Sequence, residues 1–398
     1  MLSEDVRNAF VEKKKRHTDD NDEEILLLKD YILSTECTDD IKRLIRGDYY
    51  FDVPRRFYIR RADTKRKRVC YKFSPKNNYI LKLMAYVLMD YDSLFSDSLY
   101  SFRKYQDHRT FFGRIKEVDP DRKLYVLKTD IHSYGESLDQ DILLSLLEPI
   151  VGRDRDFYNF LKWFITRNEY TDHGKVVKER FSIQPGAPIG SFFNNVYLMD
   201  MDRYIESHSR FYMRFADDIA VYCDSLSECE RIRDYISDFI KQRKLCINLD
   251  KTRIYSPGEK YAILGIAVGA GEYDISRDSL DKIMFKMERR ANNLLRRIWK
   301  KKISKEEAQR IYIAYLNNYF YGKREEKGEI NWTTWSFGII NSTKGLMELD
   351  HHVQNLIRMV STGKKSGKRY NTNYEDIKEA GYKSLVHAYY HGVDKISK

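Results

Sequence analysis

Two adjacent carboxylates, Asp217 and Asp218, stand inside a stretch of residues that favour β-structure. Residues 212–215 precede them and residues 219–222 follow, so the pattern predicts a β-hairpin with Asp217 and Asp218 as its two turn residues. Adjacent carboxylates repel each other unless a cation neutralises them, and Mg²⁺ typically takes one or two carboxylates together with substrate phosphates. The alternative for this pair alone is an ordinary Asp-Asp turn.

A third carboxylate favours the metal-binding interpretation. Asp130 lies near the end of a strand-like run over residues 124–131, and a helix-like pattern follows soon after it. One carboxylate at a strand end and two in a later hairpin are the layout of a nucleotidyl transferase, in which two Mg²⁺ ions activate a hydroxyl and stabilise the leaving pyrophosphate. We predict that Asp130, Asp217 and Asp218 are catalytic and bind both ions, with the backbone carbonyl of Ile131 as a further ligand.

The clearest helix covers residues 276–301, where apolar side chains form one stripe and cations crowd the remaining surface. We expect the apolar stripe to pack on the protein and the cationic face to contact nucleic acid. The residues predicted to make this contact are Lys286, Arg289, Arg290, Arg296 and Arg297. A second basic stretch, residues 361–369, predicts RNA phosphate contacts through Lys364, Lys365 and Lys368.

The composition fits a polyanionic partner. The chain of 398 residues has 71 Lys and Arg against 60 Asp and Glu, a net charge of +11, although lysines that keep the surface soluble contribute to this excess. The basic run at residues 13–16 is interpreted as a solvated helix face, with RNA contact as the alternative. Five scattered cysteines indicate a reducing cytoplasm, and the apolar runs are too short for a membrane span, so no membrane partner is expected.

Four segments occur in the order and spacing of a known family. They read LKTDIHSYGESLD, QPGAPIGSFFNNVYLMDMD, FADDIAVY and NLDKTRIYSPGEKYAILGIAVG, and over residues 50–320 the chain resembles a reverse transcriptase of the bacterial group II intron-like kind. The resemblance implies an α+β right-hand polymerase fold with fingers, a palm built on an antiparallel sheet, and a helical thumb. The expected parts are an N-terminal helical extension (1–48), fingers and palm (49–275), the thumb (276–324) and a C-terminal accessory region that contacts RNA (325–398).

The resemblance also implies a set of nucleotide-binding residues. They are Arg61, Lys65 and Arg68 on a basic fingers hairpin, Tyr134 and Gly135 after the first carboxylate, Gln184 and Gly186 in the Gly-Pro loop, and Lys251 beside the palm. For the hairpin cations, the alternative is a template-backbone contact or a solvated patch. Lys251 would hold a phosphate or protonate the departing pyrophosphate, unless it is a surface lysine.

The sequence departs from the family pattern at two points. Relatives usually place a Phe or Tyr where Gly135 stands, and its ring clashes with the 2′-hydroxyl of a ribonucleotide. We expect either weakened sugar selectivity or a Tyr134 ring in the vacant position, and the alternative is that Gly135 only supplies an unusual backbone turn. The family order Pro-Gln-Gly is here Gln-Pro-Gly, which affects the sugar contact expected of Gln184.

The function that follows is RNA-directed DNA polymerisation from dNTPs, giving a DNA product. Among bacterial enzymes the chain looks most like the stand-alone, defence-associated reverse transcriptases of anti-phage systems, which implies a structured noncoding RNA as template and a second protein or a second copy as partner. The alternatives are a retron-type enzyme, an intron maturase-like splicing factor, a template-independent or protein-primed polymerase, and a non-catalytic RNA-binding scaffold.

Overall fold

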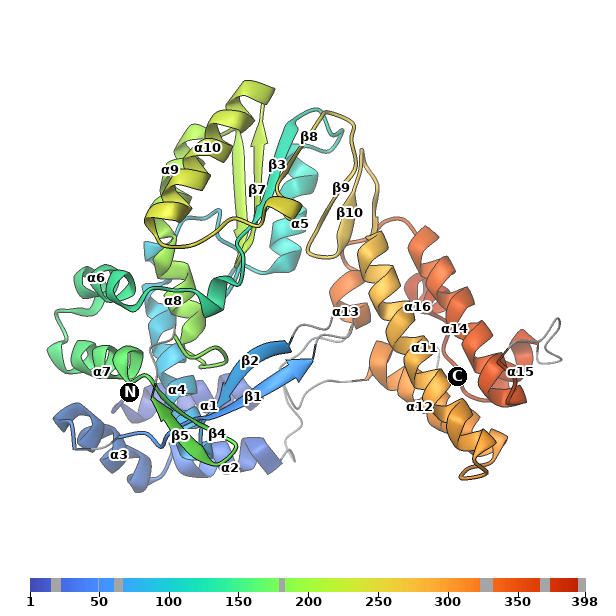
Figure 1. Cartoon of the computed structure of the whole chain (residues 1–398), viewed down its shortest axis with the longest axis horizontal. Coiled ribbons are helices and arrows are strands. Elements are labelled where there is room, and N and C mark those ends of the chain that lie inside the picture. Colours follow the sequence, from blue (N-terminus) through green and yellow to red (C-terminus); the bar gives the residue numbers. More distant parts are fainter. Residues whose placement is uncertain are drawn as a thin grey trace. The chain divides into compact units, whose positions relative to one another are not determined.

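The computed structural model describes residues 1–15, 23–48, 50–60, 67–178, 183–322, 332–365 and 373–392. These residues form two compact units (Figure 1). Unit 1 holds the described residues up to Glu259, and unit 2 holds those from Lys260 onward. Each unit has its own sheet and its own packed helices, so each is described separately.

The sheet that organises unit 1 has four antiparallel strands in the order β6-β7-β3-β8. The strands are β6 (Phe211–Phe215), β7 (Asp218–Cys223), β3 (Tyr125–Asp130) and β8 (Arg253–Tyr255). Every residue of β7 after Asp218 is buried, because this central strand has a neighbour on each side and α10 (Leu226–Gln242) packs against it. Beside α10, α9 (Met199–His208) packs on β6 (Figure 1).

The predicted basic hairpin is present in a second sheet of unit 1. Strands β1 (Arg55–Arg60) and β2 (Lys67–Lys72) pair antiparallel, with Arg55 opposite Lys72 and Arg60 opposite Lys67. Strand β4 (Glu169–Asp172) lies next to β1, and β5 (Lys175–Lys178) forms the edge. The residues that join β1 to β2 lie outside the described part of the chain.

The remaining helices of unit 1 surround the two sheets. The N-terminal helices are α1 (Glu4–Lys15), α2 (Glu23–Ile32) and α3 (Thr35–Arg46), and they pack against one another and against α4 (Pro75–Leu88) or α7 (Arg155–Thr166). The others are α5 (His108–Val118), α6 (Gln140–Val151), α8 (Gly190–Tyr197) and the short 3₁₀ helices η1 (Met89–Leu94), η2 (Tyr134–Glu136) and η3 (Leu249–Lys251). The α4 residues Ile80, Leu81 and Leu83 are fully buried.

Unit 2 combines a three-stranded antiparallel sheet with a helical bundle. The strand order is β11-β10-β9, with β9 at Tyr261–Ile263, β10 at Ile266–Val268 and β11 at Tyr273–Ile275. The main helices are α11 (Arg277–Trp299), α12 (Lys305–Tyr321) and α14 (Lys344–Thr362), which pack on one another. The short helices are α13 (Trp332–Ser336), α15 (Tyr374–Glu379) and α16 (Leu385–His391).

A buried carboxylate ties the C-terminal segment to this bundle. Asp350 of α14 accepts hydrogen bonds from the Tyr382 hydroxyl (2.7 Å), the Ser384 hydroxyl (3.0 Å) and the Leu385 backbone N–H (2.9 Å). Because three donors satisfy one buried acceptor, the chain before α16 is fixed against α14. The helices that the structure describes in the C-terminal part of the sequence therefore belong to the same unit as α11 and α12.

The α+β class expected from the sequence is confirmed, with an antiparallel sheet in unit 1 and a helical unit 2. The predicted helix at residues 276–301 is α11, and its buried face contains Leu280, Ile283, Met287 and Leu294. The four-part division at residues 48, 275 and 324 is finer than these two units and stays a prediction; strands β9 to β11 fall within unit 2. Among the described helices, none combines the length and the apolar character needed to cross a bilayer.

Candidate active site

The strand register brings the three predicted carboxylates to one end of the unit 1 sheet. Asp130, the last residue of β3, lies directly opposite Asp218, the first residue of β7. Side chains of directly opposed residues lie on the same face of a sheet, so these two carboxylates are neighbours. Asp217 precedes Asp218 in the turn between β6 and β7. One strand end and one hairpin therefore supply all three acids, as the sequence predicts.

The assignment of the turn residues was wrong by one position. Phe215 pairs with Asp218, so the two turn residues are Ala216 and Asp217, and Asp218 belongs to the strand. Ala216 has a φ of 56°, a left-handed conformation that is costly for a residue other than glycine. Its backbone is held on both sides: its N–H donates to Ser101 Oγ (2.8 Å), and its carbonyl accepts from Arg214 Nη1 (3.0 Å). These tertiary contacts impose the turn and place Asp218 beside Asp130.

The electrostatics of the three acids indicate a site that attracts cations. Burial raises the pKa of Asp218 to about 6; Lys128 lowers it, whereas the negative charges of Asp217 and Asp130 raise it further. Lys128 Nζ lies 4.0 Å from Asp218 Oδ1, and Lys251 Nζ donates to Asp130 Oδ1 at 3.1 Å. Two lysines thus partly neutralise carboxylates that would otherwise repel one another.

The donor set fits a hard divalent cation, because such ions prefer carboxylate and carbonyl oxygens. The backbone bonds around Ile131 run from His132 N–H to the Cys246 carbonyl and from Asn248 N–H to the Asp130 carbonyl. The Ile131 carbonyl takes no part in these two bonds, and its role as a ligand stays a prediction. In the described ranges, no three or more His, Cys, Asp or Glu side chains are already arranged to hold an ion. The two-ion site therefore stays a prediction.

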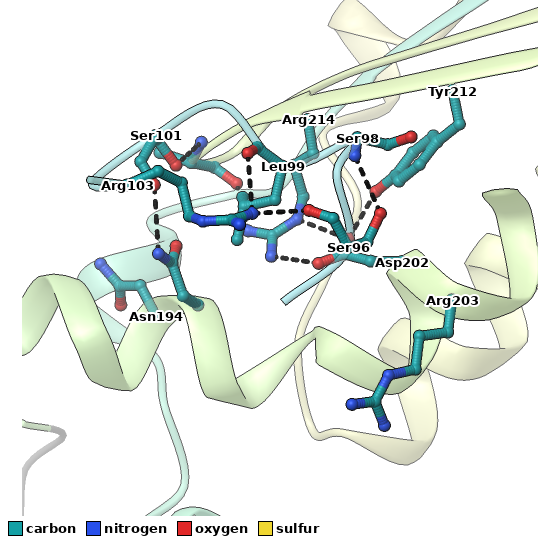
Figure 2. Close-up of polar contacts among 12 residues, drawn as sticks. Ser96, Ser98, Leu99, Ser101, Arg103, Asn194, Asp202, Arg203, Tyr212 and Arg214 are labelled. Atoms are coloured by element: carbon teal, nitrogen blue, oxygen red, sulfur yellow. Dashed lines mark hydrogen bonds and ion pairs between the residues drawn. The ribbon is translucent and has the colours of Figure 1, made fainter. Parts of the chain in front are cut away.

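A buried ion pair between Arg214 and Asp202 stabilises the hairpin (Figure 2). Arg214 and Asp202 have side chains that are 0% and 1% exposed, and Arg214 donates to both Asp202 oxygens, from Nε at 2.7 Å and from Nη2 at 2.6 Å. The Tyr212 hydroxyl donates to Asp202 Oδ1 at 2.7 Å. Burial disfavours the charge of Arg214, but the adjacent Asp202 carboxylate raises the pKa of the guanidinium above its ordinary value. The pair joins α9 to β6, two residues before the turn.

A loop of unit 1 completes this support. The Arg214 N–H donates to the Ser98 carbonyl, and the Arg214 carbonyl accepts from Tyr100 N–H, both at 2.9 Å. Asn195 Nδ2 of α8 donates to the Ser101 carbonyl at 3.1 Å, and Ser101 is the residue that holds the Ala216 N–H. Sequence reasoning missed Arg214 and Asp202, although the charged Arg214 within a β-forming run was a visible signal.

The two residues Tyr134 and Gly135, which follow the first carboxylate, have different surroundings. Tyr134 is buried and its hydroxyl donates to the Asn194 carbonyl, so its ring belongs to the core and the idea that it occupies the vacant position is wrong. Gly135 has a φ outside the left-handed region, so a special backbone turn does not explain the glycine. A Cβ at Gly135 would meet Asn194 Nδ2 at 3.8 Å, an ordinary contact. The position has space for a Cβ.

The Gly-Pro loop lies against the fingers hairpin. Tyr71 N–H of β2 donates to the Pro185 carbonyl at 3.0 Å, and Gly186 adopts a φ of 95° beside it, which requires glycine. Gln184 is 3% exposed, and its Oε1 has no hydrogen-bond partner among the described residues. A buried acceptor of this kind is costly unless a ligand or water satisfies it. Its predicted contact with the nucleotide sugar stays a prediction.

The remaining predicted binding residues lie partly inside and partly outside the described part of the chain. Arg61, Lys65 and Lys368 lie outside the described residues, and for Arg68 only its backbone position in β2, opposite Ile59, is described. Lys364 and Lys365 are exposed after the end of α14. Lys251 is half-exposed and forms the ion pair with Asp130, so it is more than a solvated surface lysine.

Four of the five cations predicted on α11 fall into two groups. Lys286 Nζ lies 4.3 Å from the Tyr319 ring centroid, and the Arg290 guanidinium lies 5.2 Å from that of Tyr315, so both pack on α12. Arg289 and Arg296 are exposed on the face opposite the buried stripe. Arg297 is half-buried. Within unit 2, only part of the predicted cationic face is therefore directed to solvent.

Comparison with known proteins adds three kinds of similarity. A family model described as reverse transcriptase (RNA-dependent DNA polymerase) matches residues 61–268. The curated Retron Ec86 reverse transcriptase of Escherichia coli is 26% identical over 106 residues, which are 26% of this chain and 33% of that protein. The alignment thus spans about one third of the length of this relative.

Solved telomerase structures are also similar. Apo telomerase from Candida tropicalis gives a TM-score of 0.48 at 10% identity, covering 80% of this chain and 60% of that one. Telomerase from Candida albicans in complex with a fragment of telomeric RNA gives 0.47 at 11% identity, covering 87% and 65%.

We predict that Arg214→Met destabilises the protein by about 3–5 kcal/mol, because it leaves the Asp202 carboxylate buried without its partner. Urea unfolding measures this free energy. Arg203→Met is the matched control, since Arg203 is exposed on the same helix as Asp202, and its cost should stay below about 0.5 kcal/mol. Adding Asp202→Leu to Arg214→Met should recover part of the loss; equal or greater destabilisation in the double variant would contradict this account of the pair.

Proposed function

This chain belongs to the reverse transcriptase family, and we propose that it is an RNA-directed DNA polymerase that uses two Mg²⁺ ions. The strongest support is the register that sets Asp130 opposite Asp218, with Asp217 in the adjoining turn. The net charge of +11 suits a nucleic-acid substrate. The activity of the whole protein is proposed and not inferred from the retron enzyme, since the alignment covers only a third of that relative.

Reverse transcriptases use divalent cations, and we assign their binding here to the side chains of Asp130, Asp217 and Asp218 with the Ile131 carbonyl. When bound, the ions would lower the pKa of the primer 3′-hydroxyl and neutralise charge on the transferring phosphate. The chain itself contributes the rigid hairpin that fixes two of the acids. Lys251 Nζ donates to Asp130 Oδ1 at 3.1 Å, and we assign to this lysine the binding of a phosphate or the transfer of a proton to the departing pyrophosphate.

We further propose that the template is a dedicated structured noncoding RNA and that the activity serves anti-phage defence in the bacterial cytoplasm. The family match, the similarity to a retron enzyme and the five free cysteines support these assignments. A second protein or a second copy of the chain completes the proposed assembly. A maturase-like factor, a protein-primed polymerase and a scaffold remain as outcomes of the experiments.

The replacement Asp217→Asn with Asp218→Asn should abolish incorporation of labelled dNTPs on the co-purifying RNA, a loss of at least about 10³-fold. Removal of Mg²⁺ by a chelator should have the same effect on the wild type. The matched control is Asp224→Asn, which changes an exposed carboxylate just beyond the opposite end of β7 and should retain full activity.

The products distinguish the alternatives. DNA complementary to one bound RNA establishes a dedicated-template polymerase, and DNA covalently attached to protein indicates protein priming. RNA binding without DNA synthesis under any of these conditions would contradict the proposed activity and favour the maturase or scaffold interpretation.

Gly135→Phe should increase the ratio of dNTP to rNTP specificity constants by about tenfold or more, because the new ring would clash with a ribose 2′-hydroxyl. Single-nucleotide incorporation kinetics measure this ratio. Gly135→Ala adds only a Cβ with an ordinary contact and should leave the ratio close to that of the wild type. A wild-type ratio already as high as that of Gly135→Phe would show that selectivity does not depend on this position.

The two groups of α11 cations should differ in RNA–DNA duplex binding. Arg289→Gln with Arg296→Gln should weaken binding by about tenfold and reduce its salt dependence, because the exposed guanidinium groups are available to phosphates. Lys286→Gln with Arg290→Gln removes the same charge but should mainly lower stability, since these cations pack on Tyr319 and Tyr315. Equal loss of affinity in both double variants would contradict the division.

A further inference from the structure

The lysines at the end of α1 do not form the solvated face expected from the sequence. Lys13 and Lys14 are half-buried. Lys13 Nζ lies 5.3 Å from the Tyr86 ring centroid and 3.2 Å from Met89 Sδ, and Lys14 Nζ lies 5.7 Å from the Phe10 centroid. Both ammonium groups are thus held against an apolar and aromatic wall formed by α1 and α4.

These lysines line a cavity of about 190 Å³ within unit 1. Lys82 of α4 is the third cation in its wall, and the aromatic residues Phe10, Tyr86 and Phe102 also line it. Ser191 and Phe192, at the start of α8, form another part of the wall, directly after the Gly-Pro loop in sequence. The cavity therefore combines converging positive charge with flat apolar surfaces.

Three lysines and one carboxylate, Asp92, line this cavity. Lys82 Nζ forms an ion pair with Glu24 at 3.0 Å, while the lining carboxylate Asp92 already accepts from Arg103 Nε at 2.7 Å. Burial lowers the pKa of Lys14, and the charges of Lys82 and Lys13 lower it further against the opposing effect of Glu24. Three clustered ammonium groups of this kind are stabilised when an anion enters.

The rim of the cavity carries a strained aromatic residue. Phe102 has a φ of 55°, which is unusual for a bulky residue, and the residue is 56% exposed. The strained backbone of Phe102 is not offset by burial of its ring, because the residue is exposed. The strain therefore points to a role in binding. A ring presented in this way can stack on a nucleobase.

We propose that this cavity binds single-stranded RNA, with a phosphate on Lys13, Lys14 and Lys82 and an unstacked base on Phe102. The site is separate from the carboxylates, and only the identity of the strand as RNA rests on the proposed function. Binding can therefore be measured without dNTPs in the Asp217→Asn Asp218→Asn protein, so that a failure of polymerase activity and a failure of this site are distinguishable.

The first test is the affinity of the 398-residue chain with Asp217→Asn and Asp218→Asn for an unstructured RNA oligonucleotide. Lys13→Gln with Lys14→Gln should weaken binding by about tenfold at low salt. The slope of the logarithm of the binding constant against the logarithm of the salt concentration should also become shallower, by about 0.7 for each phosphate that the variant no longer neutralises. Two matched charge controls are Lys15→Gln, which lies next in sequence but pairs with Glu12 at 2.8 Å outside the cavity, and Lys241→Gln, which changes an exposed lysine of α10 that does not line the cavity. The combined control should weaken binding by less than about threefold; an equal loss of affinity would overturn the site.

The second test separates binding from folding. Phe102→Asn replaces the ring with a residue that tolerates the left-handed conformation, so its melting temperature should equal or exceed that of the parent. Its affinity for the oligonucleotide should nevertheless fall about fivefold or more, because the ring no longer offers a stacking surface. Unchanged affinity in Phe102→Asn would overturn the base contact. Weaker binding accompanied by a lower melting temperature would also overturn it, since Phe102 would then act through the fold.

Discussion

The ion pair between Arg214 and Asp202 is the interaction on which the carboxylate hairpin depends. A fully buried guanidinium is costly to desolvate, and it is tolerated because both Asp202 oxygens and the Ala216 carbonyl accept its hydrogen bonds. Since the same guanidinium binds the turn, the charge pair and the turn are formed together. The strained Ala216 backbone persists because Arg214 and Ser101 hold it from both sides.

This support explains how three negative charges share one sheet end. Asp130 and Asp218 come from adjacent strands whose register is fixed by a ladder of six residue pairs. Since neither strand can shift without moving its whole buried face, the acids cannot separate to relieve their repulsion. Lys128 and Lys251 reduce that repulsion in the absence of an ion, and a divalent cation would do so more strongly. Burial is the main cause of the raised pKa of Asp218, and the same repulsion that favours a bound cation adds to it.

Positive charge is distributed in a different way from the acids. On α11 the cations divide between a face packed on the tyrosines of α12 and a face open to solvent, and on α1 two lysines enter a cavity with aromatic walls. Aromatic rings accompany the cations in both places: on α11 they hold Lys286 and Arg290 against α12, whereas on α1 they line the cavity in which we propose that Lys13 and Lys14 bind a phosphate. The basic residues thus occupy three different environments: a packed face and an exposed face on α11, and the cavity beside α1.

The sequence by itself determined the elements that local periodicity and residue type control, and only the tertiary structure decided features that depend on partners distant in sequence. The acids Asp130, Asp217 and Asp218, the basic fingers hairpin and the amphipathic helix α11 were all predicted, because alternation, helical spacing and turn residues are encoded within short stretches. The family was also identified from four ordered motifs. The structure then showed that Ala216 rather than Asp218 occupies the turn, that Tyr134 belongs to the core, and that Lys13 and Lys14 are half-buried. Each of these outcomes is set by residues far along the chain: Ser101 for Ala216, Asn194 for Tyr134, and Tyr86 for Lys13. A local pattern carries no information about such contacts, since burial and pairing arise only when separate segments pack together.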